Sequence, residues 1–394
     1  MIKSRKWLLL LVAILAVFML VACTEDTGGE TDDSVQDPAT EVESDSEDKS
    51  GGEVNIGIVL PTRDEPRWVQ DEQRFKDALE NSDYSDQYST EILFSQGSSA
   101  NELQNVETLI SRGIDTLIIA PHDGDAAGAA VQAAANEGIT VIAYDRLITN
   151  TEAVDYYVTF DSFAVGEAQG NYLIDHAEGK GLPLYLFAGA ASDNNAFLFF
   201  EGAWSVLQPK IADGTFVVAN SSEAEALADK AELTRDEQGR ILGQVTTNWD
   251  PNEAINKAQT QLTAAGDEMK GDVFILAPND GTARSIADTF AADSDITSYL
   301  ITGQDAEMAS IQYIIDGKQS MTVFKDVRNL VTDAMVMAIM LLEGANPETT
   351  GSYDNGAKDI PAIQSEVIVV DQDNVQSALI DSEYYDASDF TGLE

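Results

Sequence analysis

The architecture of this chain is most readily inferred from one stretch, Thr140-Val-Ile-Ala-Tyr-Asp-Arg-Leu-Ile148. Its first five residues form a run of β-branched and aromatic side chains after Glu137-Gly138, which predicts a short buried strand. Asp145 and Arg146 follow the last apolar residue directly. Alone, such a pair is more often a solvated surface salt bridge. In an open sheet, however, ligands bind outside the carboxyl ends of the strands, so both residues are candidate ligand-binding groups.

The alternation of a short apolar run with a helical pattern recurs along the chain. Strands are predicted at 54–60, 89–94, 116–120, 140–144, 156–160, 184–188, 216–219, 273–277, 299–302, 321–324 and 366–370. Helices are predicted at 67–79, 101–111 with Asn101 as its cap, 123–136, 164–177, 195–207, 223–233, 253–265, 282–291, 306–316 and 327–342. This order specifies an α/β fold with parallel, doubly wound sheets. About 340 residues of such elements exceed one ordinary core, so two similar Rossmann-like lobes are expected.

The N-terminus has the pattern of a secretory signal. Lys3, Arg5 and Lys6 precede an unbroken apolar run from Trp7 to Val21, which is too short to span a bilayer comfortably. The signal ends at Leu20-Val21-Ala22-Cys23, which resembles a bacterial lipobox. That resemblance implies removal of residues 1–22 and lipidation of Cys23, so we expect an extracytoplasmic protein anchored to the outer face of the cell membrane.

Residues 23–52 are rich in Gly, Ser, Thr, Asp and Glu, a composition that predicts a disordered tether. Because Cys23 is the only cysteine, no disulfide within the chain is possible. Without the signal, 19 basic residues face 69 acidic ones, a net charge near −50. Such a surface repels nucleic acid, so no nucleic-acid partner is expected. We interpret it as an adaptation to high salt, a hypothesis about habitat.

Polar side chains follow several of the predicted strands where each strand ends. Their carboxylates, amides and cations, together with two indole rings, suit a neutral polyol, whose hydroxyls both donate and accept while its C–H faces stack on aromatic rings. Taken singly, Trp68 and Trp249 are better explained as core residues, Asn195 and Asn279 as helix caps, and Asp280 as a cap. The candidate set is Arg67, Trp68, Asp145, Arg146, Asn194, Asn195, Trp249, Asn279, Asp305 and Lys325.

An ordered series of short motifs resembles the periplasmic sugar-binding proteins of ABC importers, above all the multiple-sugar-binding and xylose-binding proteins. The motifs are Arg67-Trp68, Tyr144-Asp-Arg-Leu-Ile148, Tyr157-Val-Thr-Phe-Asp161, Ser192-Asp-Asn-Asn-Ala196, Trp249-Asp-Pro251, Gly303-Gln-Asp-Ala306, Phe324-Lys325-Asp326 and Tyr353-Asp-Asn-Gly356. The segment from about Asn220 to Gly243 is longer than such proteins usually have there.

The resemblance implies a periplasmic binding protein of type I, with two lobes joined by three strand crossings and closing on one pyranose. Trp68 and Trp249 would sandwich the ring, and the other candidates would bond its hydroxyls. We place the N-terminal lobe at 53–160 plus 326–355 and the C-terminal lobe at 161–325 plus 356–394. The implied function is capture of a monosaccharide such as xylose, glucose or galactose by hinge closure, and its delivery to the permease and ATPase of an importer, by a monomer without a cofactor.

The sequence supports other functions less well. An enzyme is poorly supported, because only His122 and His176 are available for a triad or a multi-His metal site and no Gly-rich phosphate loop is found. Asp145 and Asp305 could mimic a glycosidase dyad, but Arg146 would keep a neighbouring carboxylate ionised. A sensor that presents bound sugar to a chemoreceptor or receptor kinase would use the same site. The acidic pairs at 123–125 and 371–373 lack the spacing of a calcium loop, so no metal is expected.

Overall fold

The structure is a computed structural model that describes residues 54–393. The predicted signal peptide at 1–22, the lipidation site Cys23 and the tether at 23–52 therefore lie outside the described residues. Within the described part, no helix combines the length and the apolar character that crossing a bilayer requires.

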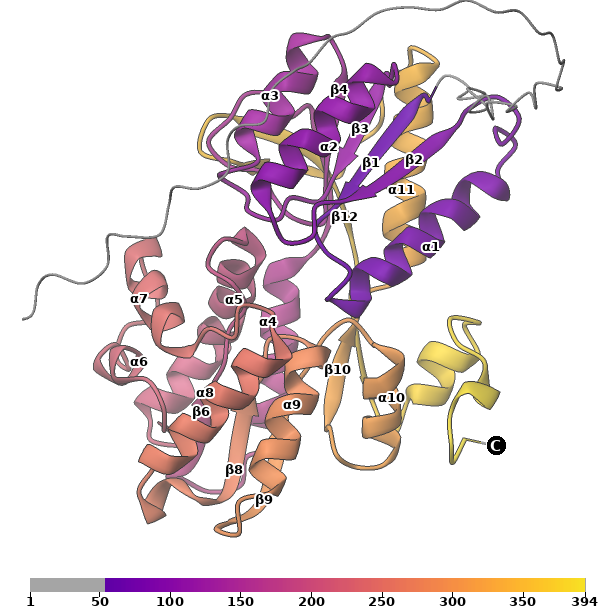
Figure 1. The fold of residues 1–394 in the computed structure, drawn as a ribbon. Helices are drawn as coiled ribbons and strands as arrows, with labels where there is room; N and C mark the ends of the chain where they lie inside the picture. The colour runs from indigo at the N-terminus through magenta and orange to yellow at the C-terminus, as the bar shows by residue number, and fades with distance from the viewer. Residues whose placement is uncertain (1–53, 394) are drawn as a thin grey trace, which may run out of the picture. The chain divides into compact units, whose positions relative to one another are not determined.

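The first lobe is built on a seven-stranded sheet with the strand order β11-β12-β5-β4-β3-β1-β2 (Figure 1). All neighbouring strands are parallel except β11, which runs antiparallel to β12. The strands are β1 (Ile56–Leu60), β2 (Thr90–Phe94), β3 (Thr116–Ile119), β4 (Thr140–Tyr144), β5 (Tyr156–Phe160), β11 (Gly351–Asp354) and β12 (Asp359–Ser365). Helices α1 (Pro66–Glu80) and α11 (Val327–Leu342) pack on one face, and α2 (Ser99–Ser111) and α3 (Gly128–Asn136) on the other.

The register of this sheet aligns apolar residues across the strands. Ile58 pairs with Ile118, and Ile118 with Ile142, and all three are fully buried beneath α1 and α11. Their chain neighbours point to the opposite face, where α2 and α3 cover them. Burial on both faces explains why these strands are continuous apolar runs and not alternating ones.

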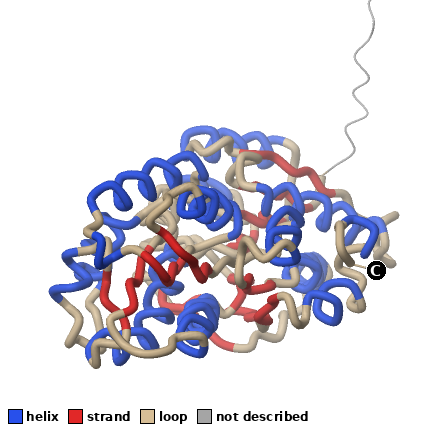
Figure 2. The backbone as a smooth tube through the Cα atoms, turned by 90° about the horizontal axis from the view of Figure 1, so that it is seen from below, coloured by secondary structure: helices blue, strands red, loops and turns tan. Residues whose placement is uncertain are grey.

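The second lobe is built on a parallel sheet with the strand order β7-β6-β8-β9. The strands are β6 (Leu182–Leu186), β7 (Phe216–Val218), β8 (Gly271–Leu276) and β9 (Ile296–Ile301). One face carries α4 (Ser162–Asp175), α5 (Asn194–Ala212), α6 (Ser222–Ala226) and α7 (Arg235–Val245), and the other carries α8 (Pro251–Ala264) and α9 (Asp280–Ala291). Figure 2 shows the helices surrounding the strands. Helices α4 and α5 pack so closely that a Cβ on Gly166 would stand 1.9 Å from the carbonyl oxygen of Phe199.

The chain passes between the two lobes three times, after β5, after β10 (Met321–Phe324) and after β12. Strand β10 pairs antiparallel with β13 (Ile368–Asp371) and also meets Gln304, just beyond β9. Helix α10 (Met308–Ile315) lies between β9 and β10 in sequence. The last described residues hold one π-turn at Gln376–Ile380 and a 3₁₀ turn at Ala387–Asp389, and a further 3₁₀ turn spans Asp267–Met269.

Several local predictions are wrong. Strands β11 and β12 were not predicted. Because β12 pairs with β5, residues 359–365 belong to the first sheet. The structure therefore does not agree with the predicted boundary between the lobes at 355/356. The helix predicted over 223–233 is confined to α6, and α7 follows it in the same long segment. Ser98, not Asn101, caps α2, because its hydroxyl accepts from the backbone N–H of Asn101.

Candidate functional site

The loops at the carboxyl ends of the strands bring their polar side chains into one pocket between the lobes. The first lobe supplies residues after β1 and β4, and the second supplies residues after β6, β8, β9 and β10 together with the loop before α8. The lining residues are Glu65, Arg67, Trp68, Asp145, Arg146, Asp193, Asn195, Phe199, Trp249, Asn279, Gln304, Asp305 and Lys325. Nine of the ten predicted residues are therefore gathered in one place.

Asn194 is the exception. It lines a different hollow, together with Asp123, Asn150 and Arg235. Asp193 is the N-cap of α5 and accepts from the backbone N–H of Asn195, so Asn194 and Asn195 are the first two helical residues. Successive helical residues point about 100° apart, so only one of the two can face the pocket. The structure does not bring Asn194 to the site.

The cap predictions are also partly wrong. Asn195 is not a cap, whereas Asn279 is the N-cap of α9 and accepts from the backbone N–H of Thr282. Asp280 is the first helical residue, fully buried, and its carboxylate accepts from the backbone N–H of Glu307. Asp280 thus connects the loop that carries Asn279 to the loop that carries Asp305.

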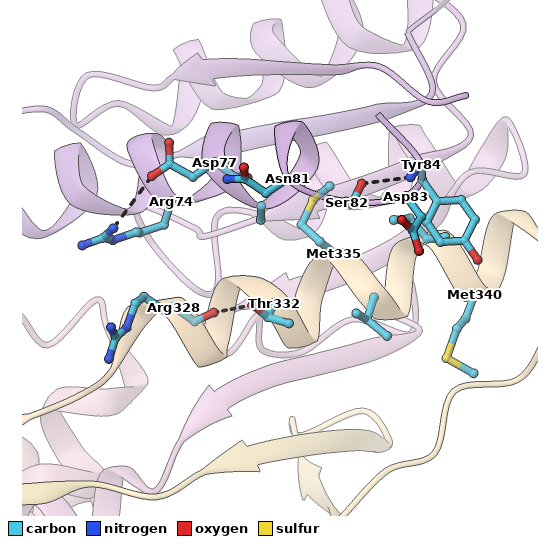
Figure 3. Close-up of a pocket in the computed structure, with 13 residues that line it drawn as sticks. Arg74, Asp77, Asn81, Ser82, Asp83, Tyr84, Arg328, Thr332, Met335 and Met340 are labelled. Atoms are coloured by element: carbon cyan, nitrogen blue, oxygen red, sulfur yellow. Dashed lines mark hydrogen bonds and ion pairs between the residues drawn. The ribbon is translucent and has the colours of Figure 1, made fainter. Parts of the chain in front are cut away.

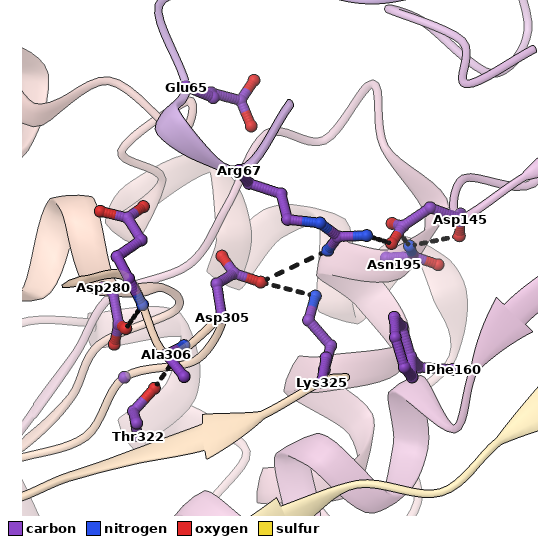
Figure 4. Close-up of polar contacts among 12 residues, drawn as sticks. Glu65, Arg67, Asp145, Phe160, Asn195, Asp280, Asp305, Ala306, Thr322 and Lys325 are labelled. Carbon is purple, nitrogen blue, oxygen red and sulfur yellow. Dashed lines mark hydrogen bonds and ion pairs between the residues drawn. The ribbon is translucent and has the colours of Figure 1, made fainter. Parts of the chain in front are cut away.

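Arg67 is the centre of an ion-pair network (Figure 4). Its Nε lies 2.8 Å from Oδ1 of Asp71, and its Nη2 lies 2.8 Å from Oδ2 of Asp145. Its Nη1 lies 3.6 Å from Oδ1 of Asp305. Nζ of Lys325 lies 2.8 Å from the same oxygen. The guanidinium is almost wholly buried, and a buried cation is tolerated only where carboxylates surround it.

Arg146 forms a second bridge between the lobes. Its Nε lies 3.0 Å from Oδ2 of Asp193 in the second lobe, while its Nη2 lies 3.1 Å from Oε2 of Glu65 in the first. A third link is neutral: Nδ2 of Asn195 donates to the backbone carbonyl of Asp145 over 2.8 Å. Glu65, Asp193, Phe199 and Gln304 were missed by sequence reasoning, although Asp193 and Gln304 lie beside predicted residues within motifs already singled out.

The electrostatics of the pocket follow from burial and from this pairing. Burial raises the pKa of Asp145, but Arg67, Lys325 and Arg146 together overcome that effect and hold the pKa below its usual range. Burial raises the pKa of Asp71 to about 6 despite the opposing effect of Arg67. Asp145 is therefore a hydrogen-bond acceptor at neutral pH and not a proton donor.

Two tryptophans supply flat apolar surface. Trp68, at the start of α1, lies beneath both arginines, with the guanidinium carbons of Arg67 and Arg146 at 5.2 and 4.9 Å from the ring centre. Trp249 packs edge-to-face on Phe199 at 6.2 Å. Its backbone has φ 62°, a left-handed conformation that is strained for an aromatic residue, and Asp145 shares this conformation at φ 60°. Strained residues of this kind concentrate at functional sites.

Four buried uncharged polar atoms of the pocket-lining residues have no hydrogen-bond partner among residues 54–393. They are the indole Nε1 atoms of Trp68 and Trp249 and the amide oxygens of Asn195 and Gln304. Leaving a buried polar atom unpaired costs about 1–3 kcal/mol, so natural proteins seldom do so without a reason. The residues that line the pocket thus offer two unpaired donors and two unpaired acceptors, which suit an uncharged polar ligand.

A larger hollow lies elsewhere, between α1 and α11 on the first lobe (Figure 3). It is open and largely apolar, with Met335, Val336 and Ile339 among its lining residues. It receives no residue from the carboxyl ends of the strands. The convergence of polar groups favours the pocket between the lobes as the functional site.

Comparison with known proteins agrees with this geometry. Residues 56–346 match the family model described as a periplasmic binding protein domain. The chain belongs to the periplasmic binding protein family. Members of this family are substrate-binding receptors and not enzymes, as the sequence predicted. The predicted type I fold is confirmed as well.

Relatives of this periplasmic binding protein include sugar receptors. The chain is 35% identical to the multiple sugar-binding periplasmic receptor ChvE of Rhizobium radiobacter, over 84% of this chain and 91% of that protein. It is 30% identical to the D-xylose-binding periplasmic protein of Escherichia coli, over 86% and 92%. A carbohydrate transporter solute-binding protein of Chloroflexus aurantiacus, solved with D-glucose, is 67% identical, covers 86% of this chain and 99% of its own, and superposes with a TM-score of 0.84.

Proposed function

We propose that this periplasmic binding protein captures one monosaccharide in the pocket between its lobes and delivers it to an ABC importer. The observation that carries the proposal is the set of four buried, uncharged polar atoms without a hydrogen-bond partner on residues that line the pocket, two of them on indole rings. Sugar hydroxyls can donate to the amide oxygens of Asn195 and Gln304 and accept from the indole N–H groups. The sugar's C–H faces can stack on the indoles.

D-Glucose is the first sugar to test. D-Glucose occupies the 67% identical protein of Chloroflexus aurantiacus, and β-D-glucose a second solute-binding protein, of Clostridium phytofermentans, that is 31% identical with a TM-score of 0.73. Xylose and galactose differ from glucose at one ring substituent and form the comparison panel.

Binding proceeds by closure of the lobes. Both lobes contribute to the ion pairs around Arg67 and Arg146, so the pocket is complete only in the closed form. A ligand that touches both lobes binds the closed form more tightly and shifts the population towards it. The permease of the importer then recognises the closed form. Small-angle X-ray scattering of the mature chain should give a smaller radius of gyration with D-glucose than without it, and an unchanged radius would contradict closure.

The mature chain is held at the outer face of the membrane by a lipid on Cys23. This part of the proposal is supported by Leu20-Val21-Ala22-Cys23 at the end of an apolar signal. In cells fed an alkyne-labelled fatty acid, the parent protein should carry the label and sediment with membranes. Cys23→Ser should remove the label, and a labelled Cys23→Ser protein would exclude this anchor.

A further inference from the structure

The loop that carries Asp305 has a strained backbone that is held at several points. Asp305 and Ala306 have φ 98° and 50°, in a region that residues with a Cβ seldom adopt. The N–H of Asp305 donates to the carbonyl of Val323 over 2.9 Å, and the N–H of Ala306 donates to Oγ1 of Thr322 over 3.2 Å. Figure 4 shows the contact of Ala306 with Thr322. Such a conformation persists only where the surroundings fix it.

The carbonyl of Ala306 is held from a distant part of the chain. The hydroxyl of Tyr385, in the C-terminal segment, donates to it over 2.9 Å. That segment is fastened to α10 of the second lobe, because Gln312 and Thr391 exchange two hydrogen bonds of 3.1 and 2.8 Å. Tyr385 is therefore placed by the second lobe against the loop beside Asp305.

The same hydroxyl also contacts the first lobe. Nε2 of Gln70 donates to the oxygen of Tyr385 over 3.1 Å, and Oε1 of Gln70 accepts from the hydroxyl of Tyr384 over 3.2 Å. Gln70 lies in α1, one turn after Arg67. A single phenol oxygen thus joins the helix that carries Arg67 and Trp68 to the loop that carries Asp305.

We propose that Tyr385 is a positioning residue for the sugar pocket. Its hydroxyl fixes the strained loop so that Asp305 faces Arg67 and Lys325, and its bond to Gln70 forms only when the lobes are closed. It does not line the pocket itself. This inference rests on the proposed function, because its consequence is tighter retention of the sugar.

The test compares Tyr385→Phe with Tyr185→Phe in the mature chain. Tyr185 is a matched control, because its hydroxyl also donates to a backbone carbonyl over 2.9 Å, that of Met269, in the second lobe but away from the pocket. Tyr385→Phe should weaken D-glucose binding by roughly five- to thirtyfold, the effect of losing one or two hydrogen bonds, mainly through faster dissociation. Tyr185→Phe should leave the affinity within twofold of the parent.

A second readout does not depend on the sugar. In the unliganded protein, amide hydrogen exchange across residues 303–307 should be faster in Tyr385→Phe than in the parent and unchanged in Tyr185→Phe. Unaltered affinity with unaltered exchange, or an equal loss of affinity in Tyr185→Phe, would overturn the inference. If the parent binds no sugar, the proposed function fails, and the exchange of residues 303–307 alone decides whether Tyr385 holds this loop.

Discussion

Nη1 of Arg67 and Oδ1 of Asp305 lie 3.6 Å apart and join the first lobe to the second inside the pocket between them. Arg67 comes from the first turn of α1, and Asp305 follows β9, so the pair forms only where two sheet edges face one another. Lys325 shares the same carboxylate oxygen at 2.8 Å. Under the proposed function, the carboxylate of Asp305 would serve both lobe closure and the recognition of hydroxyls.

Replacing this carboxylate should weaken sugar binding. Asp305→Asn keeps the shape but removes the charge that Arg67 and Lys325 share, so we expect the affinity for D-glucose to fall by about ten- to a hundredfold. The melting temperature should also fall, because buried Lys325 loses its counter-charge. Calorimetric titration and thermal unfolding measure the two effects. Asp316→Asn, which removes an exposed pair with Lys318, is the control, and equal affinities for the two variants would contradict the assignment.

The position of Trp249 depends on a glycine in the loop after β6. A Cβ on Gly189 would stand 2.0 Å from the indole ring, so Gly189→Ala must displace the ring. We expect at least a tenfold loss of sugar affinity, measured by titration. Gly239→Ala, in α7, adds a Cβ that would meet no other atom within 4 Å, so it should leave affinity unchanged and stabilise the fold by about 0.5–1 kcal/mol. Normal affinity in Gly189→Ala would mean that the indole does not contact the ligand.

Because Glu102 is buried, we expect the stability of the fold to depend on pH. It is fully buried in α2, its carboxylate accepts from the backbone N–H of His122, and burial raises its pKa to about 7. Between pH 4.5 and pH 7 the unfolded chain has lost a proton that the folded chain keeps. The free energy of unfolding therefore falls as the pH rises through this window, by up to about 3 kcal/mol from this group.

Glu102→Gln should abolish that contribution. Urea unfolding at pH 5 and pH 8 should show a smaller loss of stability in Glu102→Gln than in the parent. Glu107→Gln, on an exposed position of the same helix, is the control and should behave like the parent. A pH dependence that is identical in all three proteins would refute the buried, protonated state of Glu102.

Because acidic residues greatly outnumber basic ones, we expect the stability of the fold to depend on salt concentration. With a net charge near −50 after removal of the signal, repulsion between carboxylates destabilises the compact state at low ionic strength. Screening shortens the Debye length from about 10 Å at 0.1 M to about 3 Å at 1 M. The midpoint of urea unfolding should therefore rise with sodium chloride up to molar concentrations, and a midpoint indifferent to salt would refute the halophilic interpretation.

The sequence predicted secondary structure correctly where a local pattern is typical of only one kind of element. The strands at Thr140–Tyr144, Tyr156–Phe160 and Met321–Phe324 and the helix at Val327–Leu342 have the predicted bounds. Because parallel strands end at a common edge, side chains far apart in sequence could be assigned to one pocket. Arg67 and Asp145 follow strands of the same sheet and meet for that reason, whereas Lys325 follows β10, which belongs to a separate two-stranded sheet.

The remaining features needed three-dimensional information. Asn194 and Asn195 have the same chemistry, and only the start of α5 at Asn194 decides which one faces the pocket. Strand β12 contains Pro361 and ends in polar residues, so its strand pattern is weak. The start of helix α7 was predictable from the sequence. Thr234 and Glu237 form a capping box, and their spacing in the sequence is typical of a helix start.

Binding of one neutral monosaccharide in the pocket between the lobes can be measured by calorimetric titration of the mature chain. D-Glucose, D-xylose, D-galactose and L-arabinose would be titrated at low and at high salt, with Trp249→Ala beside the parent. We predict one-to-one binding of at least one of these sugars by the parent and its loss in the variant. A folded parent that gives no heat with any of the four would contradict the account.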